Sequence, residues 1–382
     1  MIIMRKIKIF VSAILALGLF AGCNAKYSVT GDALYLAESS HGASKKLVID
    51  EKGITLKVSP RMVQNATKDV TARLVVDNEA LEAFNKKAGT SYKPVPSELI
   101  TLSSDVVKIG KGMLSEKPIE VSVKAFTDQM NKSGDKFALA FSLKDVQGTD
   151  VLKALSSFVY EFEPVIITSV PVLQSSNVVK MSMRQDYSLT AWSFEFRVNM
   201  SVLGHAVGFM NNQAILGAYG PGTEIYVRFG DAPIRGDLLQ VKHQGTQINT
   251  NTQFQDNTWY HIAITSDNKN MRIYVNGELD ATLALPGNVN NIKSDGINMI
   301  TSGGWFRAKC MLSEVRFWTK TITQDQIRNN MFAINPSSEG LEGYWKMNEG
   351  SGNTFADATS HGNNALAEGS FIWKDGIRSD GK

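Results

Sequence analysis

The chain has 382 residues, with 40 lysines and arginines against 37 aspartates and glutamates, and a formal net charge of +3 at pH 7. Three of the positive charges, at Arg5, Lys6 and Lys8, lie in the first 22 residues, which contain no acid, so removing this segment leaves a net charge of 0 (+3 minus 3). A neutral chain has no electrostatic basis for nucleic-acid binding, and we expect no nucleic-acid partner.

Residues 1–22 are predicted to be a lipoprotein signal peptide. The basic residues precede an apolar run from Ile9 to Phe20, which is too short to span a bilayer. Small residues then precede Cys23 in a pattern that resembles a bacterial lipobox, so we expect lipidation at Cys23. The alternative is an ordinary signal peptide followed by an unmodified cysteine. Residues 23–31 would form a tether to the cell envelope, with the outer membrane as the expected location.

Residues 32–163 contain a series of short segments in which apolar and polar side chains alternate, which predicts strands. The clearest segments are 54–58, 70–76 and 119–123. The one clear helix is predicted from Asn78, as its cap, to Lys87, and Gly89 ends it. This arrangement favours a β-sandwich of about seven strands with one helical crossover.

The helix and the residues after it carry a family resemblance. Residues 83–92, Ala-Phe-Asn-Lys-Lys-Ala-Gly-Thr-Ser-Tyr, followed by Pro96 and Leu99, resemble a family of uncharacterised immunoglobulin-like N-terminal domains. Members of that family precede laminin-G-like or glycosidase domains in glycan-utilisation lipoproteins. The resemblance implies an immunoglobulin-like sandwich of unknown function over residues 32–163, with other envelope glycan-utilisation proteins as partners.

A second domain is predicted over residues 165–376. Pro164 marks the boundary, because proline favours an extended conformation at the residue before it, and the composition then shifts toward Asn, Gly and Trp. The centre of this domain is predicted to be a β-hairpin over residues 257–279. Apolar residues on both faces of 259–264 indicate a buried strand, and Asn276-Gly277 is a strong two-residue turn signal.

Three phrases in this half resemble the laminin-G-like, concanavalin-A-like domains of bacterial surface proteins. They are Trp-Tyr-His-Ile-Ala at 259–263, Ser-Glu-Val-Arg-Phe-Trp at 313–318, and Gly-Tyr-Trp-Lys-Met-Asn-Glu-Gly-Ser-Gly at 343–352. The resemblance implies a jelly-roll sandwich over residues 165–376. The expected fold class is therefore all-β: an immunoglobulin-like β-sandwich followed by a concanavalin-A-like jelly roll.

No catalytic residue is assigned from the sequence. Glycosidases with this jelly-roll scaffold place paired carboxylates at alternating positions of one strand, yet neither Glu-x-Asp-x-Glu nor Glu-x-Asp-x-x-Glu occurs. Glu195 and Glu314 are isolated acids among aromatic residues and arginine, and we interpret them as outward or ion-paired strand carboxylates. No histidine lies in a nucleophile-elbow context. A carboxylate pair contributed by distant loops stays open.

The laminin-G-like resemblance also implies Ca²⁺ as a cofactor, held by carboxylate, amide and backbone oxygens. The candidate ligands are Asp295 and Asp357, with Asn288, Asn291 and Asn353 nearby in the sequence. Ordinary turn chemistry is the favoured alternative for each single residue, because Asp and Asn populate turns for local reasons.

Carbohydrate binding needs an exposed aromatic ring and planar polar groups, because a sugar has an apolar face and a rim of hydroxyls. Trp305 follows two glycines, and Tyr219 lies among glycines, so both are predicted on loops at one edge of the second domain. The predicted polar partners are Arg307, Arg235 and His243. The alternative for both aromatic residues is a loop side chain folded over the edge of the core.

Together these patterns predict a cell-envelope lipoprotein that binds a polysaccharide or glycan without catalysis, within a glycan capture or degradation system. Two other functions stay open. One is a glycoside hydrolase with an unrecognised active site, and the other is a protein-binding adhesion or assembly module.

Overall fold

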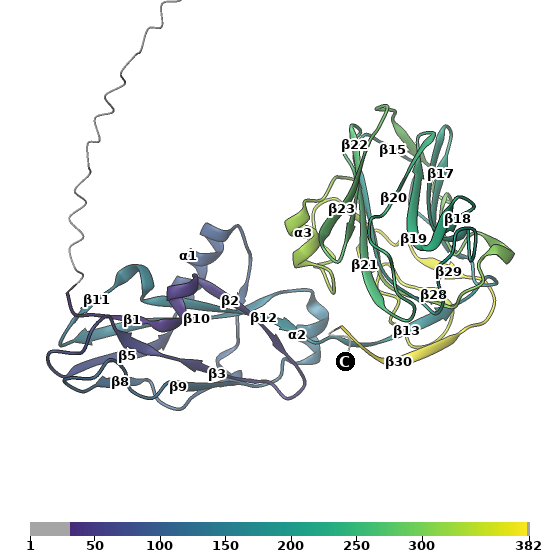
Figure 1. The fold of residues 1–382 in the computed structure, drawn as a ribbon. Coiled ribbons are helices and arrows are strands. Elements are labelled where there is room, and N and C mark those ends of the chain that lie inside the picture. The colour runs from purple at the N-terminus through teal and green to yellow at the C-terminus, as the bar shows by residue number, and fades with distance from the viewer. Residues whose placement is uncertain (1–30, 380–382) are drawn as a thin grey trace, which may run out of the picture.

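The structure, a computed structural model, describes residues 31–379. Figure 1 shows two β-rich domains joined end to end, which confirms the all-β expectation. Each domain has its own hydrophobic core, one drawn from residues 34–162 and the other from residues 173–367. The predicted signal peptide and Cys23 lie outside the described residues. Within the described part of the chain, no helix is long and apolar enough to cross a bilayer.

The first domain contains three sheets, of six, three and three strands, that surround one core. The six-stranded sheet has the order β2-β12-β10-β5-β8, with β6 paired to β10, and the smaller sheets have the orders β11-β1-β4 and β3-β9-β7. The bounds are β1 (Ala33–Leu36), β2 (Ser44–Ile49), β3 (Ile54–Val58), β4 (Pro60–Met62), β5 (Val70–Val76), β6 (Lys93–Pro94), β7 (Ile100–Leu102), β8 (Val106–Ile109), β9 (Ile119–Val123), β10 (Phe137–Gln147), β11 (Asp150–Val151) and β12 (Ser157–Pro164).

Two α-helices lie in the first domain, α1 (Asn78–Ala88) and α2 (Asp128–Ser133). The predicted helix is therefore present, but its cap is Asp77, whose side chain accepts a hydrogen bond from the Ala80 amide, and not Asn78. Gly89 ends α1 in the left-handed conformation, as predicted, and Gly134 ends α2 in the same way.

The second domain is a sandwich of two eight-stranded sheets, with a further two-stranded pair, β15-β24. One sheet has the order β23-β22-β21-β16-β26-β13-β30, with β27 paired to β26, and the other has the order β20-β19-β18-β17-β25-β14-β29-β28. The bounds are β13 (Ile167–Leu173), β14 (Val179–Met181), β15 (Tyr187–Leu189), β16 (Trp192–Met200), β17 (Gln213–Gly220), β18 (Thr223–Asp231), β19 (Ile234–His243), β20 (Thr246–Asn249), β21 (Trp259–Ser266), β22 (Asn270–Val275), β23 (Glu278–Ala284), β24 (Asn290–Ile292), β25 (Ile297–Met299), β26 (Cys310–Trp318), β27 (Leu341–Trp345), β28 (Thr354–Phe355), β29 (Ala365–Ala367) and β30 (Ile372–Arg378).

The predicted hairpin is formed by β21 and β22, and the Asn276-Gly277 turn joins β22 to β23. Both turn residues have positive φ, 50° and 81°, which explains the choice of Asn and Gly there. β21 is buried on both faces, as its sequence predicts. Ile262 and Ile264 face the core between the sheets, whereas Ala263 contacts a second, smaller core on the outer face.

That smaller core lies under the segment that follows β26. Its cover includes α3 (Gln324–Asn329), whose first turn is fixed by a capping box between Thr323 and Gln326. Ile322, Ile327 and Ile334 from this cover pack onto aromatic side chains of the sheet, Tyr274, Trp318 and Tyr344. The cover lies on the side of the second domain that faces the first domain (Figure 1).

A buried cluster of charged and polar side chains holds this cover on the sheet. Arg316 of β26 is fully buried and donates to Glu314 and, at 2.7 Å, to the carbonyl of Asn330, just beyond α3. Its guanidinium lies 3.6 Å from Glu195, which also accepts from the Trp318 indole at 2.8 Å. Burial alone would raise the pKa of Glu195, but the charge of Arg316 holds that pKa below its ordinary value.

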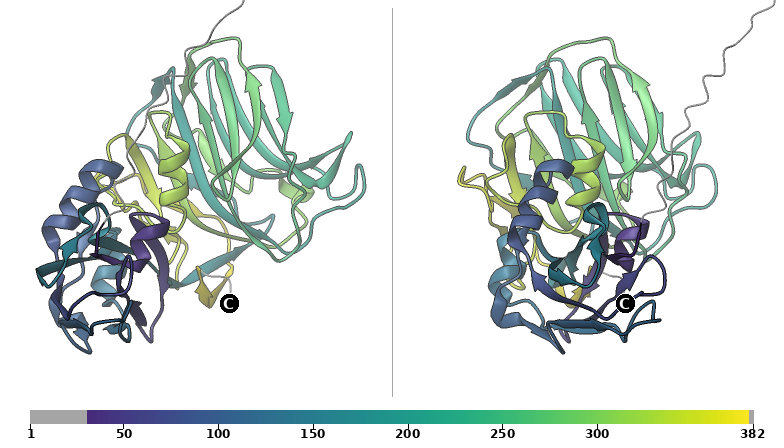
Figure 2. Two further views of the ribbon diagram at one scale, coloured as in Figure 1. Left: turned by 60° about the vertical axis from the view of Figure 1, so that its left-hand side comes forward. Right: turned by 90° about the vertical axis from the view of Figure 1, so that its left-hand side faces the viewer.

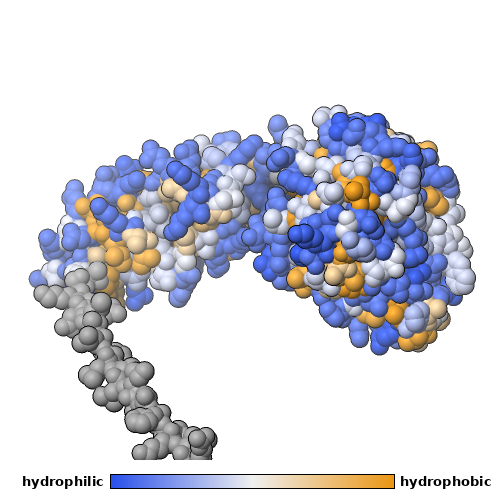
Figure 3. Space-filling view, turned by 90° about the horizontal axis from the view of Figure 1, so that it is seen from above, coloured by the Kyte–Doolittle hydropathy of each residue, from blue (hydrophilic) through white to orange (hydrophobic). Residues whose placement is uncertain are grey.

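The two domains meet through a very short linker and three direct contacts. β12 ends at Pro164 and β13 begins at Ile167, and the intervening Val165 amide donates to the Ile49 carbonyl. Lys46 of β2 donates to the Asn329 side chain at 2.9 Å, and Arg378 of β30 pairs with Glu51. Figure 3 shows this junction from above as a narrowing with a mainly hydrophilic surface.

Gly134 makes the third contact, in which its backbone lies against that of Ile334. A Cβ at this position would lie 2.5 Å from the carbonyl oxygen of Ile334 in the second domain. No side chain can occupy that space without moving one of the backbones. Figure 2 shows the facing helices α1 and α3 on either side of this junction.

We predict that Gly134→Ala opens the junction between the domains. The substitution combines a left-handed conformation, which costs a non-glycine residue roughly 1–2 kcal/mol, with a steric clash against Ile334. Gly89→Ala is the matched control, because Gly89 also caps a helix at positive φ but nothing lies within 4 Å of its added Cβ. Small-angle scattering should show an increased radius of gyration for Gly134→Ala alone. Equal profiles for the two variants would contradict the prediction.

We also predict that Arg316→Met destabilises the second domain by about 3–5 kcal/mol, because it leaves Glu195 and Glu314 in the interior without their counter-charge. Tryptophan fluorescence during urea unfolding reports on this domain, since all six tryptophans lie in it. The control Arg272→Met breaks a partly exposed pair with Asp267 and should cost less than about 1 kcal/mol. A loss of similar size in both variants would show that the buried cluster has no special weight.

Candidate functional site

Trp305 is the exposed tryptophan of the second domain. It ends a short 3₁₀ turn, η4 (Gly303–Trp305), and 57% of its surface is accessible. Trp192, Trp318 and Trp345 are buried, and Trp259 and Trp373 are half-buried. The sequence therefore separated Trp305 correctly from the tryptophans of the core. Its glycine neighbours indicated a loop, and the structure shows that this loop does not fold over the core.

A second loop brings further exposed apolar side chains to the same edge. Phe209 and Val207 are 54% and 63% exposed, and the Arg307 guanidinium lies 5.9 Å from the centre of the Phe209 ring. Val207 forms an isolated β-bridge with Arg235. We call Val207, Phe209, Arg235, Trp305 and Arg307 the loop-edge surface. Three of these five residues, Trp305, Arg307 and Arg235, were predicted from the sequence.

The loop-edge surface is anchored by buried polar side chains. The carbonyl oxygen of the Gln213 side chain accepts hydrogen bonds from the backbone amides of Arg307, at 3.1 Å, and Ala308, at 2.8 Å. Gln213 is fully buried, so the backbone beyond Trp305 is fixed to the start of β17. This anchoring orders the loop before any ligand arrives, which lowers the entropic cost of binding.

Asp237 anchors the other side of the surface. It is buried, accepts two hydrogen bonds from Arg235, and lies 3.0 Å from Nδ1 of His205. Burial alone would raise the pKa of Asp237, but the hydrogen bonds from Arg235 and His205 hold it below its ordinary value. Arg235 is thus held by a carboxylate, with its guanidinium still partly accessible.

Tyr219 does not lie at this edge, contrary to the prediction. It belongs to β17, six residues beyond Gln213, a separation of roughly 20 Å along a strand. Its ring lies against Gly217, where a Cβ would come within 2.5 Å of the ring. Burial raises the pKa of Tyr219 to about 12. The half-buried ring is part of the outer face of its sheet, at the opposite end from Trp305.

His243 is also placed where a surface ligand would not reach it. The ring is fully buried, stands edge-on to Trp192 at 5.4 Å between centres, and lies 3.3 Å from the Glu224 carbonyl. Burial lowers the pKa of His243, so the ring is neutral at pH 7. His243 is therefore a packed residue of the interior and not a polar partner for a surface ligand.

The two predicted calcium ligands, Asp295 and Asp357, lie in different connecting segments of the second domain. Asp357 accepts backbone or side-chain hydrogen bonds from Tyr344, Thr359 and Asn363, which occupy both of its oxygens. Asp295 lies exposed in the turn before β25. Over residues 31–379, no group of three or more His, Cys, Asp and Glu side chains is arranged to hold a metal ion. These hydrogen bonds give Asp357 a local structural role, and calcium binding stays a prediction.

Glu195 and Glu314 are ion-paired, as interpreted from the sequence. Both contact Arg316, and Glu314 also accepts from the Tyr344 hydroxyl at 2.6 Å. These two carboxylates have structural partners in the interior, so we assign neither of them a role in hydrolysis.

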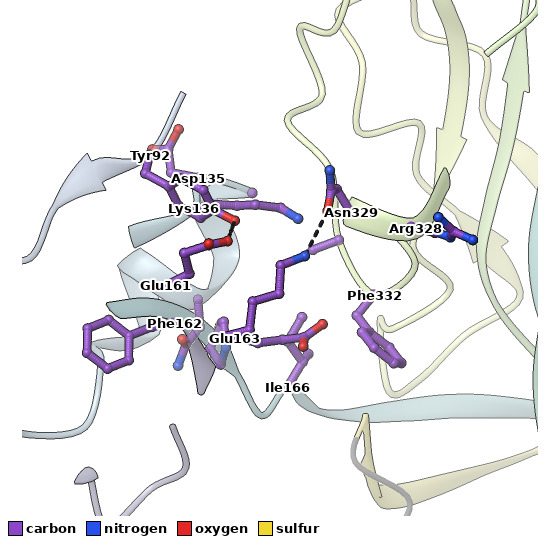
Figure 4. A pocket seen from close by; sticks show the side chains of 15 residues that line it. Tyr92, Asp135, Lys136, Glu161, Phe162, Glu163, Ile166, Arg328, Asn329 and Phe332 are labelled. Carbon is purple, nitrogen blue, oxygen red and sulfur yellow. Dashed lines mark hydrogen bonds between the residues drawn. The ribbon is translucent and has the colours of Figure 1, made fainter. Parts of the chain in front are cut away.

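A cleft between the domains is a second surface that can hold a ligand (Figure 4). The first domain contributes Tyr92, Lys136 and Glu161, and the second contributes Asn329 and Phe332. Lys136 also lines two further hollows at the junction. This cleft could not be predicted from the sequence, because its walls come from segments about two hundred positions apart.

Comparisons with known proteins agree with this architecture. Residues 173–328 match the family model of the concanavalin A-like lectin/glucanases superfamily, and residues 30–150 match a model described as an N-terminal domain. Comparison with curated proteins gave no match.

Two solved structures illustrate the likeness. One is a "putative carbohydrate binding protein" from Bacteroides ovatus, with 24% identity, coverage of 90% of this chain and 97% of that chain, and a TM-score of 0.59. The other is a heptameric SAP-like pentraxin from Limulus polyphemus, with 12% identity, coverage of 53% and 95%, and a TM-score of 0.37, which is too low to support an argument. The first shows a shared fold over nearly the whole chain. The second sandwich of this protein is a laminin-G-like domain of the concanavalin A-like lectin/glucanase superfamily, and it follows an N-terminal β-sandwich domain.

Proposed function

We propose that this protein binds carbohydrate without catalysis, through the loop-edge surface of its second domain. The observation that carries the proposal is Trp305, a large aromatic side chain left 57% exposed on an anchored loop. Exposing such a ring to water is unfavourable, and a sugar face is a suitable partner for it.

The residues around Trp305 supply the other half of a sugar site. Arg307 places its guanidinium beside the Phe209 ring, and Arg235 is paired through its backbone with Val207. Guanidinium groups donate several hydrogen bonds in one plane. Hydroxyl pairs on a pyranose ring can accept from such a fork, while the ring face packs on Trp305 or Phe209. The loops that carry these residues sit on a rigid sandwich, where binding residues concentrate.

The superfamily and the description of the Bacteroides ovatus structure support carbohydrate binding in general. A lectin-like scaffold hosts many functions, so the loop-edge surface supports carbohydrate binding more directly than the fold does. An exposed apolar edge also suits a protein partner, and a hydrolase would need carboxylates beside the ligand. The experiment below separates these functions.

The predicted outcome for Trp305→Ala is a loss of glycan affinity of about tenfold or more, because stacking on the ring is worth on the order of 1 kcal/mol beyond area burial. A glycan array with the mature chain identifies the ligand, and calorimetry compares the variants. Phe209→Ala should show a smaller loss, and Ile372→Ala, an exposed apolar side chain on β30, should show none. Melting temperatures should be nearly equal for all three.

Three results would contradict this assignment. If Trp305→Ala binds glycan as tightly as the native chain, the loop-edge surface is not the site. If the native chain releases reducing sugar from the bound glycans, the protein is a hydrolase. If no glycan on the array binds, a protein partner for the loop-edge surface becomes the better explanation.

We further propose that Cys23 carries the lipid that anchors the protein in the cell envelope, at the outer membrane, within a glycan capture or degradation system. The signal-peptide pattern of residues 1–22 supports this proposal. Cys23→Ala should move the protein from the membrane fraction to the soluble fraction after cell fractionation. Cys310→Ala is the control, because Cys310 is buried in the core and its loss should leave the protein in membranes. A Cys23→Ala variant that stays in membranes would refute the anchor.

A further inference from the structure

The cleft between the domains contains an ammonium group, that of Lys136, which has no direct hydrogen-bond or ion-pair partner among the described residues. Lys136 lies between Gly134, at the end of α2, and the start of β10, and its side chain extends toward the second domain (Figure 4). Among the described residues, none hydrogen-bonds to its Nζ or lies within ion-pairing distance of it. The group is half-buried in a hollow that both domains line.

Most other charged groups in the cleft already have partners. Glu161 accepts from the Tyr92 hydroxyl at 2.6 Å, and Lys46 donates to Asn329 at 2.9 Å, as the dashed lines in Figure 4 show. The remaining pairs are Asp135 with Lys93 and Arg328 with Glu278. The exception besides Lys136 is Glu163, an exposed carboxylate that is not ion-paired with it. The cleft therefore offers one uncommitted cation, Lys136, and one uncommitted anion, the more exposed Glu163, to an incoming ligand.

The environment of Lys136 makes an anion favourable there. Burial lowers the pKa of Lys136 to about 8, and the charges of Lys46 and Arg316 act in the same direction. The carboxylates of Glu163 and Glu161 act against this lowering. The group is still mainly protonated at pH 7, so the free protein holds a partly desolvated charge with no carboxylate in direct contact. An oxyanion beside Nζ would supply that counter-ion and form a charge-assisted hydrogen bond.

We propose that this cleft is a second saccharide site, which binds the carboxylate of an acidic sugar through Lys136. The inference rests on the proposed carbohydrate-binding function and adds a ligand class that the loop-edge surface does not select. Phe332 provides an apolar wall on the second-domain side, and the Asn329 amide lies on the same side (Figure 4). A uronate ring between the domains would have its carboxylate at Lys136 and one face toward Phe332.

The experiment compares acidic sugars with neutral copies of the same shape. The probes are glucuronate- and galacturonate-containing oligosaccharides and their methyl esters, titrated into the mature chain by calorimetry. We expect the native chain to bind at least one acid about tenfold more tightly than its ester, a difference that a single charge-assisted contact can supply. Lys136→Met should abolish that preference and leave the ester affinity unchanged.

Two further variants make the result specific to this group. Lys136→Arg keeps the positive charge and should retain part of the preference. Lys180, on β14, forms an exposed ion pair with Glu368. The control variant Lys180→Met removes this charge and should retain the full preference for the acid over its ester. The melting temperature of ligand-free Lys136→Met should equal or exceed that of the native chain, because a desolvated, unpaired charge is removed. A merely structural lysine would show a lower melting temperature instead.

Failure of this inference is distinguishable from failure of the proposed function. If glycans bind in a Trp305-dependent way but no acid is preferred over its ester, the cleft is not an acidic-sugar site and the proposed function stands. If an acid is preferred and Lys136→Met preserves the preference, the inference is overturned because the carboxylate binds elsewhere. If no saccharide binds at all, both proposals fail.

Discussion

The buried arginine of β26 is the constraint on which the arrangement of the second domain depends. Arg316 is surrounded by two carboxylates, an aromatic ring and a backbone carbonyl, so its charge is compensated on several sides in the interior. The contact with the Asn330 carbonyl is important for the cleft between the domains, because it fixes the end of α3 against the sheet. A hydrophobic core alone would hold this cover less specifically, since apolar contacts have little directional preference.

The cleft inherits its geometry from this cluster. Asn329, which receives the hydrogen bond from Lys46, is adjacent in sequence to the residue that Arg316 holds. Ile334, whose carbonyl faces Gly134, belongs to the small core beneath the same cover. Two of the three direct contacts between the domains therefore depend on a segment that is fixed by buried charge. The third, between Arg378 and Glu51, is formed by the edge strand β30.

The sequence predicted what is encoded locally and missed what is assembled over distance. The hairpin around Asn276-Gly277, the helix ending at Gly89 and the exposure of Trp305 all depend on neighbouring residues, and all are found. Tyr219 and His243 were misplaced because a strand end and a loop look alike in sequence, and only the register shows which side chains turn inward. Phe209 follows Gly208 much as Trp305 follows Gly304, so a usable signal was present. The Lys136 cleft had none, since its walls are brought together only when both domains have folded and docked.

The two-residue connection between β12 and β13 has a mechanical consequence. Because Val165 is hydrogen-bonded to the edge of the first domain, almost no rotatable backbone is left free between the domains. Domains joined by longer linkers generally sample many orientations. Here the short linker would transmit a force or a torque applied to one domain directly to the other domain. If a polysaccharide binds at the loop-edge surface, the orientation of the first domain would therefore determine the direction in which that surface faces.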